Sequence, residues 1–370
     1  MMTKLKLRGI SKNFGRGAVV RDLDLDVADE EFVALLGPSG CGKSTTLSII
    51  AGFEQPDAGE LQLDGKTITA WAPQQRNIGL VFQDYALFTR MTVRDNLEFG
   101  LKVRRIASSE RKRRLSEFVE RLGLGDILEH RSSSLNMSEM QKVALARALI
   151  VGPSVILLDE PMSNLDSAVR ARLRTELKLI QKEFRQTVLY VTHDQIEAMT
   201  MADRIAVMRD GAIEQIGTPR EIYDRPRNRF VAEFIGEPAI NLIKGHIDEA
   251  GNVSTEPHGL VKSRQNWRYS GDLLLGIRPF DVQAKRTPDA TTVPAVITDI
   301  ENLGAEQVVH FPYGRQLICA VVPRRFSRVG ETLHVAFDFA NVHAIDPSNG
   351  EVISNGTEAT ANRRGVEVRQ

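Results

Sequence analysis

A short glycine-rich segment constrains the fold of this chain more than any other part of the sequence. It runs Gly37-Pro38-Ser39-Gly40-Cys41-Gly42-Lys43-Ser44-Thr45, which matches the pattern G-x-x-x-x-G-K-S. The apolar run 32–36 before it predicts a buried strand, and residues 46–51 after it predict a helix that ends at Gly52. Strand, glycine-rich loop and helix in this order are the context that a phosphate-binding loop requires.

The chemistry of this loop predicts binding of a nucleoside triphosphate. Glycines allow backbone N–H groups to surround a β-phosphate, and the N-terminus of the following helix adds the positive end of its dipole. Lys43 can reach the β- and γ-phosphates, and the Ser44 hydroxyl can hold Mg²⁺.

Length and composition indicate a two-domain globular protein. The chain has 370 residues, more than one hydrophobic core usually spans, and is 42% hydrophobic and 26% charged. Lys+Arg and Asp+Glu both total 48, so the balance of charge does not favour a nucleic-acid partner. Cys41 and Cys319 cannot make a disulfide framework, which fits a reduced, cytoplasmic setting. Without a long apolar run or a signal core, a membrane role requires partner subunits.

Residues 1–237 predict an α/β domain, because strand-like and helix-like segments alternate along them. The run 155–158 is continuously apolar, as in a parallel sheet covered on both faces. The charged run 111–114 is expected on the solvated face of a helix. Further strands are expected at 78–82, 188–191 and 205–208, and helices at 108–124, 139–150 and 168–184.

Beyond about residue 237 the pattern changes to short strands separated by Gly and Pro turns. This spacing predicts a small all-β barrel over residues 238–350. The last residues, 351–370, are polar and poor in apolar side chains, which predicts a disordered tail. The clearest strands of the barrel are expected at 273–277, 293–300, 308–311 and 333–337.

Two carboxylates, Asp159 and Glu160, follow the apolar run 155–158. A strand would place both at its carboxyl end, where α/β sheets bind ligands. We expect Asp159 to hold Mg²⁺, directly or through water, and Glu160 to polarise the water that attacks the γ-phosphate.

Taken in order, the motifs resemble the ATPase subunits of ABC transporters, in particular those of maltose-type bacterial sugar importers. The resemblance covers residues 1 to about 350. Besides the phosphate loop and the two carboxylates, it rests on Phe14, Gln83, Ser163-Asn164-Leu165-Asp166, His193, residues 230–236 and Gly276-Ile277-Arg278-Pro279.

The resemblance implies the fold and the reaction. It implies an α/β P-loop ATPase domain with an antiparallel β part and a helical subdomain at 1–237. An all-β, OB-like domain of the TOBE type, with regulatory and dimerisation roles, would follow at 238–350. The expected reaction is hydrolysis of ATP, with Mg²⁺ as cofactor, coupled to solute import.

The resemblance also implies roles for single residues. Glu160 would be the catalytic base, and His193 the switch histidine near the γ-phosphate. Gln83 would take part in catalysis, join Ser44 and Asp159 at the metal, and link the nucleotide to the membrane partner. Two further residues belong to the expected nucleotide site: Phe14, which would stack on adenine, and Asp166, in the loop that signals across the ATPase dimer.

The chain departs from the family at the signature motif, where L-S-G-G-Q is replaced by Leu135-Asn136-Met137-Ser138-Glu139. In the family this segment closes over the γ-phosphate bound by the other subunit. Asn136 and Ser138 can still bind a phosphate, whereas Met137 adds a side chain where close backbone approach is expected. Glu139 adds a carboxylate, and two like charges about 4 Å apart repel by about 4 kcal/mol at an effective dielectric near 20. Glu139 is therefore expected to point away, to be screened by Mg²⁺, or to weaken closure.

Three consequences of this departure stay open. The site hydrolyses ATP despite the changes, or the chain pairs with a different, more regular ATPase, or it binds ATP mainly as a structural clamp. We favour the working ATPase, because Asp159, Glu160, His193 and Gln83 are all present.

The expected partners are two permease subunits, a second ATPase subunit, preferably an identical one, and indirectly an extracytoplasmic solute-binding protein. Nucleic acid is not expected as a partner. The permeases would contact the segment Gln83–Phe88, in which Tyr85, Leu87 and Phe88 are either exposed anchors or core residues. The protein would lie on the cytoplasmic face of the inner membrane as a peripheral subunit.

The transported solute is expected to be a sugar, a sugar derivative or a polyol, with polyamine, iron or sulfate as alternatives. A different class of function is a soluble ABC-type ATPase that acts on nucleic acid or the ribosome. Zero net charge and the lack of tandem ATPase domains disfavour it. A third possibility is that the C-terminal barrel senses a ligand.

Overall fold

The computed structural model describes residues 2–15, 17–163, 165–250, 252–255, 259–261, 269–289, 292–324, 326–337 and 341–355. The chain divides into two compact units, Met1–Pro219 and Arg220–Gln370. Each has its own hydrophobic core. Asn164 lies outside the described residues, as does most of the tail predicted at 351–370.

The first unit begins with an antiparallel sheet in the strand order β2-β1-β4-β5. Every buried leucine or isoleucine of its first strand packs into the core of this unit, because alternate side chains of a strand face the same side. Its strands are β1 (Thr3–Asn13), β2 (Ala18–Ala28), β4 (Ala58–Leu63) and β5 (Lys66–Thr67).

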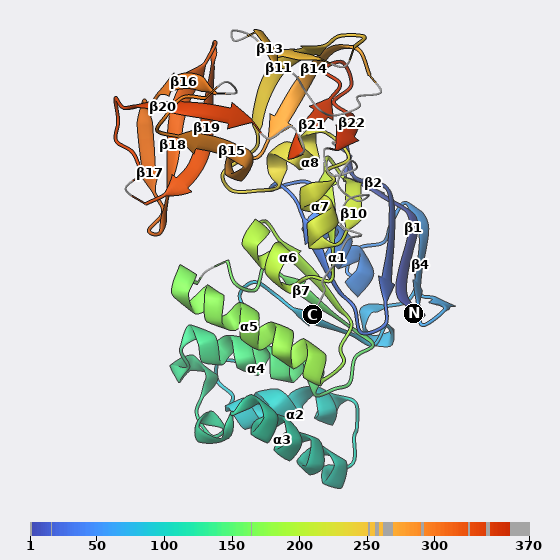
Figure 1. Ribbon diagram of the computed structural model, residues 1–370. Helices are drawn as coiled ribbons and strands as arrows, with labels where there is room; N and C mark the ends of the chain where they lie inside the picture. Colours follow the sequence, from blue (N-terminus) through green and yellow to red (C-terminus); the bar gives the residue numbers. More distant parts are fainter. Residues whose placement is uncertain are drawn as a thin grey trace, which may run out of the picture. The chain divides into compact units, whose positions relative to one another are not determined.

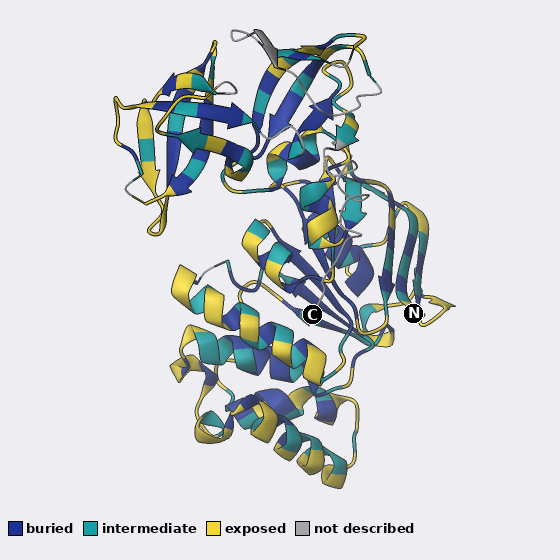
Figure 2. Cartoon of the chain, in the orientation of Figure 1, coloured by how far each residue is buried: buried dark blue, intermediate teal, exposed yellow. Residues whose placement is uncertain are grey.

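A second sheet, in the order β10-β9-β3-β8-β7-β6, positions the phosphate loop. All its neighbouring pairs are parallel except β9 with β10. Every residue of β3 and β8 is buried, as Figure 2 shows for the central strands. The strands are β3 (Phe32–Leu36), β6 (Ile78–Val81), β7 (Val155–Asp159), β8 (Val188–Thr192), β9 (Arg204–Arg209) and β10 (Ala212–Gly217).

The register of this sheet aligns the ends of three strands. Leu36 of β3 lies opposite Thr192 of β8, and Asp159 of β7 lies opposite Val191 of β8. The loops after β3, β7 and β8 therefore begin at one edge, which is where an α/β sheet binds its ligand.

Helix α1 follows the phosphate loop, and α4 lies next to α5 in Figure 1. Helices α2, α3 and α4 pack on one another, and α5 packs on α6. Helix α2 is not among the helices expected from the sequence, although its buried Val93, Leu97 and Leu101 recur at helical spacing. A Cβ on Gly100 would lie 2.7 Å from Val151 Cγ1, so glycine suits the close packing there. The helices are α1 (Lys43–Ala51), α2 (Val93–Val103), α3 (Ser108–Leu122), α4 (Met137–Leu149), α5 (Ser167–Glu183) and α6 (Gln195–Met201).

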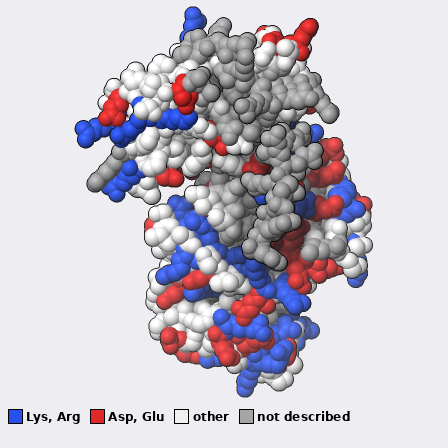
Figure 3. Space-filling view, in the orientation of Figure 1, with Lys and Arg blue, Asp and Glu red and all other residues white. Residues whose placement is uncertain are grey.

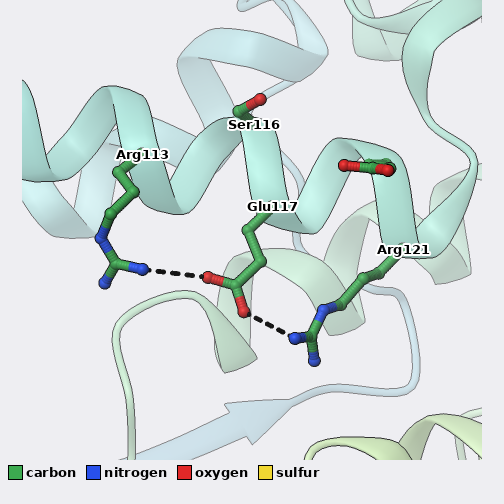
Figure 4. A pocket seen from close by; sticks show the side chains of 5 residues that line it. Arg113, Ser116, Glu117 and Arg121 are labelled. Carbon is green, nitrogen blue, oxygen red and sulfur yellow. Dashed lines mark hydrogen bonds and ion pairs between the residues drawn. The ribbon is translucent and has the colours of Figure 1, made fainter.

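Arg113 and Arg114 of the charged run on α3 pair with carboxylates of their own helix. Arg113 contacts Glu110 and Glu117, Arg114 contacts Glu110, and Arg121 contacts Glu117. Figure 4 shows Glu117 between Arg113 and Arg121, and Figure 3 shows both signs of charge interspersed. The predicted solvated helix face is confirmed, and exposed pairs of this kind contribute little to stability.

The second unit is mainly antiparallel β structure, preceded by two short helices. Its sheets have the orders β13-β12-β11-β14-β21-β22, β15-β20-β16 and β17-β18-β19. The helices are α7 (Pro219–Asp224) and α8 (Arg229–Phe234). The strands are β11 (Asn241–Ile247), β12 (Val253–Thr255), β13 (Gly259–Val261), β14 (Gly271–Ile277), β15 (Val282–Lys285), β16 (Val293–Val296), β17 (Asp299–Asn302), β18 (Glu306–Tyr313), β19 (Gln316–Pro323), β20 (Thr332–Phe337), β21 (His343–Ile345) and β22 (Val352–Asn355).

One predicted strand, 293–300, is wrong. The structure has two strands there, because the chain changes sheets: β16 pairs with β20, whereas β17 pairs with β18. Among the described residues, no helix combines the length and apolar character that crossing a membrane requires.

A buried arginine in the second unit holds its helices against its strands. Arg278 is 2% exposed and donates hydrogen bonds to the carbonyls of Tyr223 at 3.1 Å, Ala232 at 2.9 Å, and Ile235. Its guanidinium also lies over the Tyr223 ring, 4.3 Å from the centroid. The carbonyls near the ends of α7 and α8 are therefore bound by a side chain of the strand region.

A second buried arginine, Arg76, supports the helix that follows the phosphate loop. It is 1% exposed. Its guanidinium donates to the carbonyls of Ile49 at 2.6 Å and Ile50 at 2.9 Å, at the end of α1. It also donates to the carbonyls of Thr69 and Trp71, each at 2.8 Å.

We predict that Arg76→Leu lowers the free energy of unfolding of the first unit by about 3 kcal/mol, because buried carbonyls lose their donors. Urea denaturation of the full chain measures this loss. The exposed Arg104→Leu is the control, with an expected change within about 0.5 kcal/mol. Equal losses in both variants would contradict the role of Arg76.

Candidate nucleotide-binding and hydrolysis site

The glycines of the phosphate loop are required by close backbone approach. A Cβ on Gly37 would lie 2.3 Å from the Met208 carbonyl oxygen, and one on Gly42 would lie 2.5 Å from the Val19 carbonyl oxygen. Gly42 also has φ 102°, a left-handed conformation that favours glycine. The loop is thus held tightly at both ends. Between them, Pro38, Ser39 and Gly40 are exposed.

Lys43 is buried without a carboxylate partner. It is 5% exposed, and its Nζ donates to the carbonyls of Gly37 at 2.8 Å and Pro38 at 2.9 Å. Within the described part of the chain, no ion pair includes Lys43. A buried ammonium group that hydrogen-bonds to neutral groups gains from a nearby anion. The loop therefore fits a phosphate group.

Helix α1 begins without a side-chain cap, because its N-cap residue is Gly42. The first N–H groups of a helix lack intrahelical partners, and together with the helix dipole they favour an anion. Ser44 is exposed in this first turn, and Thr45 is half-buried.

Ser44 and Asp159 together form an oxygen-rich pair at the end of β7. The Ser44 hydroxyl donates to Asp159 Oδ1 at 3.2 Å. Burial raises the pKa of the Asp159 carboxyl, and nearby Glu160 acts in the same direction, while Ser44 and Lys43 oppose the shift. A hydroxyl and a carboxylate are ligands that Mg²⁺ accepts when waters and substrate phosphates complete its shell. The described residues hold no cluster of three or more His, Cys, Asp or Glu side chains for a metal.

Glu160 and His193 lie side by side at the same edge of the sheet. His193 Nδ1 is 3.1 Å from Glu160 Oε2, and the Glu160 side chain is 23% exposed. Glu160 has φ 44°, and its backbone N–H donates to the Val191 carbonyl at 3.0 Å. The neighbouring strand β8 holds this strained backbone, with the carboxylate next to His193.

The other predicted site residues are on the surface. Gln83 and Phe14 are both exposed, and Lys12 Nζ lies 5.2 Å from the Phe14 ring centroid. Asp166 is exposed and caps α5 by accepting from Val169 N–H at 3.0 Å. In the described residues, no hydrogen bond joins Gln83 to Ser44 or Asp159, so its role at a metal stays a prediction.

The altered signature segment forms a capping box at the start of α4. The Asn136 side chain accepts from Glu139 N–H at 3.0 Å, and the Glu139 carboxylate accepts from Asn136 N–H at 2.9 Å. Glu139 is thus folded back on its own helix. Sequence reasoning treated it as an unpaired charge, although the spacing N-x-x-E is that of a capping box. Ser138 is half-buried beside it and accepts from Arg172 Nη2 at 3.4 Å through its Oγ.

Comparisons with known proteins agree with this geometry. A family model described as ABC transporter matches residues 20–163, and one described as TOBE domain matches residues 275–345. The trehalose/maltose import ATP-binding protein MalK of Thermococcus litoralis is 41% identical over 372 residues, which cover 95% of this chain and 100% of that protein. The chain belongs to the ATP-binding subunits of ABC importers.

Other similar proteins support the same family. The sn-glycerol-3-phosphate import protein UgpC 1 of Rhizobium johnstonii is 39% identical, over 96% of this chain and 97% of its own. The xylose/arabinose import protein XacJ of Haloferax volcanii is 40% identical, over 96% of both chains. The structure of cbiO1 from Clostridium perfringens, part of an ABC transporter complex, matches with TM-score 0.56 and 27% identity, over 60% of this chain and 91% of that one.

These findings confirm the predicted fold class and reaction of the ABC ATPase. It combines a P-loop ATPase domain with a β-rich TOBE domain, and it hydrolyses ATP as a subunit of an importer.

Tyr85 of this ABC ATPase is not an exposed anchor. It is 3% exposed, its hydroxyl donates to the Pro161 carbonyl at 3.0 Å, and burial raises its pKa to about 12. Phe88 is exposed and Leu87 half-buried, so the two alternatives for this segment apply to different residues.

Sequence reasoning missed Arg147, which joins α4 to the segment after β6. Its guanidinium donates to the carbonyls of Tyr85 at 3.0 Å and Ala86 at 2.8 Å, and it lies 5.5 Å from the Phe88 ring centroid. Burial lowers the pKa of Arg147. The retained end of the signature helix thus contacts the segment predicted to meet the permeases.

We predict that Glu160→Gln lowers ATP turnover at least about 100-fold, because the amide cannot accept the proton of the attacking water. Binding of a fluorescent ATP analogue is expected to stay within a few-fold of wild type. Phosphate release measures turnover, and the exposed Glu183→Gln is the control. Wild-type turnover in Glu160→Gln would refute this assignment.

Both thiols are expected to react slowly. Burial raises the pKa of Cys41, and it raises the pKa of Cys319 to about 11, so each group stays a thiol at pH 8. Iodoacetamide should therefore modify the native ABC ATPase at least about 10-fold more slowly than the urea-unfolded chain. Raising the pH should speed the native reaction. Fast labelling of Cys41 at pH 8 would contradict the burial of its thiol.

Proposed function

We propose that this ATPase subunit powers import of a sugar, a sugar derivative or a polyol. The observation that carries the proposal is similarity over nearly the whole chain to import subunits named for trehalose/maltose, xylose/arabinose and glycerol-3-phosphate. These named solutes share a chain or ring of hydroxyl groups. The solute itself would be selected by the permeases and by an extracytoplasmic binding protein.

In the proposed reaction, Glu160 accepts the proton of the attacking water, and His193 beside it acts at the γ-phosphate. Lys43 and the first N–H groups of α1 bind the phosphates. These electrostatic interactions are stronger in a low-dielectric site than in water. Ser44, Asp159 and Gln83 would hold Mg²⁺, which when bound neutralises the β- and γ-phosphate oxygens. Support comes from the 3.1 Å approach of Glu160 and His193 and from the buried, unpaired charge of Lys43.

The complete site is proposed to need a second ATPase subunit, preferably an identical one. Phe14 would stack on the adenine, and the partner copy's signature segment, including Asn136 and Ser138, would cover the γ-phosphate. Asp166 would lie in the loop at this interface. Residues 1–237 would act as the ATPase domain and 238–350 as a regulatory and dimerisation domain.

Two permease subunits are proposed to dock near Gln83–Phe88, on the cytoplasmic face of the inner membrane. Exposed aromatic rings in this part of the first unit support the proposal. Phe82 lies 6.3 Å from Phe53 and Phe88 lies 4.6 Å from Phe99, measured between ring centroids, and all these rings are exposed. Such rings can grip an amphipathic helix of a partner.

The solute is tested by reconstituting the ABC ATPase with the permeases that co-purify with it, in vesicles containing ATP. We expect sugars or polyols on the cognate binding protein to stimulate phosphate release and solute uptake. Stimulation by a polyamine, iron or sulfate instead would overturn the proposed solute class. Failure to co-purify with any permease would count against the partner assignment.

The altered signature is tested in the Glu160→Gln background. We expect Glu139→Gln to lower the ATP concentration needed for dimerisation at least about 10-fold, because it removes a charge that repels polyphosphate. Analytical ultracentrifugation measures the dimer, and the exposed Glu120→Gln is the control.

A further variant restores Ser-Gly-Gly-Gln at 136–139 in the reconstituted transporter. An unchanged ATPase rate there, together with unchanged dimerisation of Glu139→Gln, would show that the departure from the family sequence is neutral.

A further inference from the structure

An ion pair joins the start of α5 to the turn that carries His193. Arg170 Nη1 donates to Asp194 Oδ2 at 3.0 Å, and the two side chains are 31% and 20% exposed. Helices α5 and α6 lie side by side in the first unit (Figure 1). Because His193 directly precedes Asp194, the ion pair acts one residue away from the proposed switch histidine.

On the α5 side, Arg170 is fixed to the loop that follows Glu160. Its backbone N–H donates to the Asp166 carbonyl at 2.9 Å in the first turn of the helix. Asp166 is the N-cap of α5, so Arg170 lies one helical turn from the loop predicted to signal across the dimer. Arg170 therefore belongs to the first turn of α5, directly after its N-cap Asp166.

On the other side, Asp194 has two functions at once. Its Oδ1 caps α6 by accepting from Glu197 N–H at 3.1 Å, which leaves Oδ2 for Arg170. Its own N–H donates to Thr192 Oγ1 at 2.9 Å. The backbone on both sides of His193 is thereby defined, while the imidazole is 52% exposed beside Glu160.

The buried carboxylate of Glu197 binds the end of β8, which precedes this turn. Glu197 Oε2 accepts from the hydroxyls of Tyr190 and Thr192, each at 2.7 Å, and Glu197 is 3% exposed. Burial raises the pKa of Glu197, while the two hydroxyls oppose the shift. The strand end and the first turn of α6 are therefore one rigid piece. Arg170 connects this turn to the start of α5 by an ion pair.

We propose that Arg170 is a positioning residue for ATP hydrolysis, which sets the place of His193 against Glu160 through Asp194. The inference rests on the proposed role of His193. Movement of Asp166, when a second subunit binds, would reach His193 through Arg170 and Asp194. Arg170 meets Asp194 through one Nη atom only, and its Nε is buried without a hydrogen-bond partner among the described residues. This charged contact joins the start of α5 to the turn that carries His193, whereas Lys178 pairs with Asp203 further along α5.

The expected signature is a loss of kcat with little change in KM. Small displacements of a catalytic group cost rate without affecting the binding of phosphates, so Arg170→Ala should lower kcat about 10-fold and leave KM for ATP within about two-fold. Asp194→Asn should do the same, because an amide oxygen still caps α6 but the charge for Arg170 is lost. Arg170→Lys should recover part of the rate.

The decisive experiment is a double-mutant cycle on the full chain. If the residues act through one contact, Arg170→Ala/Asp194→Asn has about the same kcat as the slower single variant. Lys182→Ala removes a positive charge from an exposed position of the same helix and should have the wild-type rate. Thermal unfolding is measured for each variant. If Arg170→Ala does not fold, the comparison of kcat between Asp194→Asn and wild type tests the inference.

Three results would overturn the inference. These are multiplicative losses in the double variant, a rise in KM that accounts for the whole effect, or a wild-type kcat in Asp194→Asn. His193→Ala separates this inference from the proposed site. If His193→Ala keeps the wild-type rate, the role of His193 is wrong and the inference falls with it. If only His193→Ala is slow, the site stands and the role of Arg170 is wrong.

Discussion

The site depends on the parallel register of three neighbouring strands. Leu36, Asp159 and Thr192 end β3, β7 and β8 at one edge of the sheet. Neighbouring strands lie about 4.8 Å apart, so residues more than a hundred positions apart in sequence meet without long side chains. A shift of one residue in any of these strands would also turn its apolar side chains to the opposite face. The hydrophobic core and the catalytic edge are therefore set by the same register.

Much of this arrangement could be predicted because its signals are local. The phosphate loop, the helix end at Gly52 and the pair Asp159-Glu160 each follow from a few adjacent residues. Tyr85 could not be placed, because its burial depends on the distant Pro161 carbonyl. The contact between Arg170 and Asp194 is likewise invisible in sequence, since neither residue belongs to a motif that predicts the other.

In the signature segment, one carboxylate caps its own helix and also affects the proposed binding of a nucleotide at the same helix start. In this subunit, Glu139 satisfies a backbone N–H at the start of α4 that would otherwise lack a partner. The same carboxylate makes that helix start less attractive to a polyphosphate, because it adds negative charge where the helix dipole favours an anion. The capping box and the proposed closure over nucleotide therefore make opposite demands on this position.

The hydrogen bonds of Arg278 determine which C-terminal truncation of the chain leaves buried carbonyls without donors. The carbonyls of Tyr223, Ala232 and Ile235 all depend on this guanidinium, which belongs to the strand region of the second unit. A chain cut at residue 237 would keep α7 and α8 but lose the donor that binds them. A chain cut at Pro219, where the first compact unit ends, would leave no such orphaned carbonyls. The helices after Pro219 thus belong, in their hydrogen bonding, to the part of the protein that follows them.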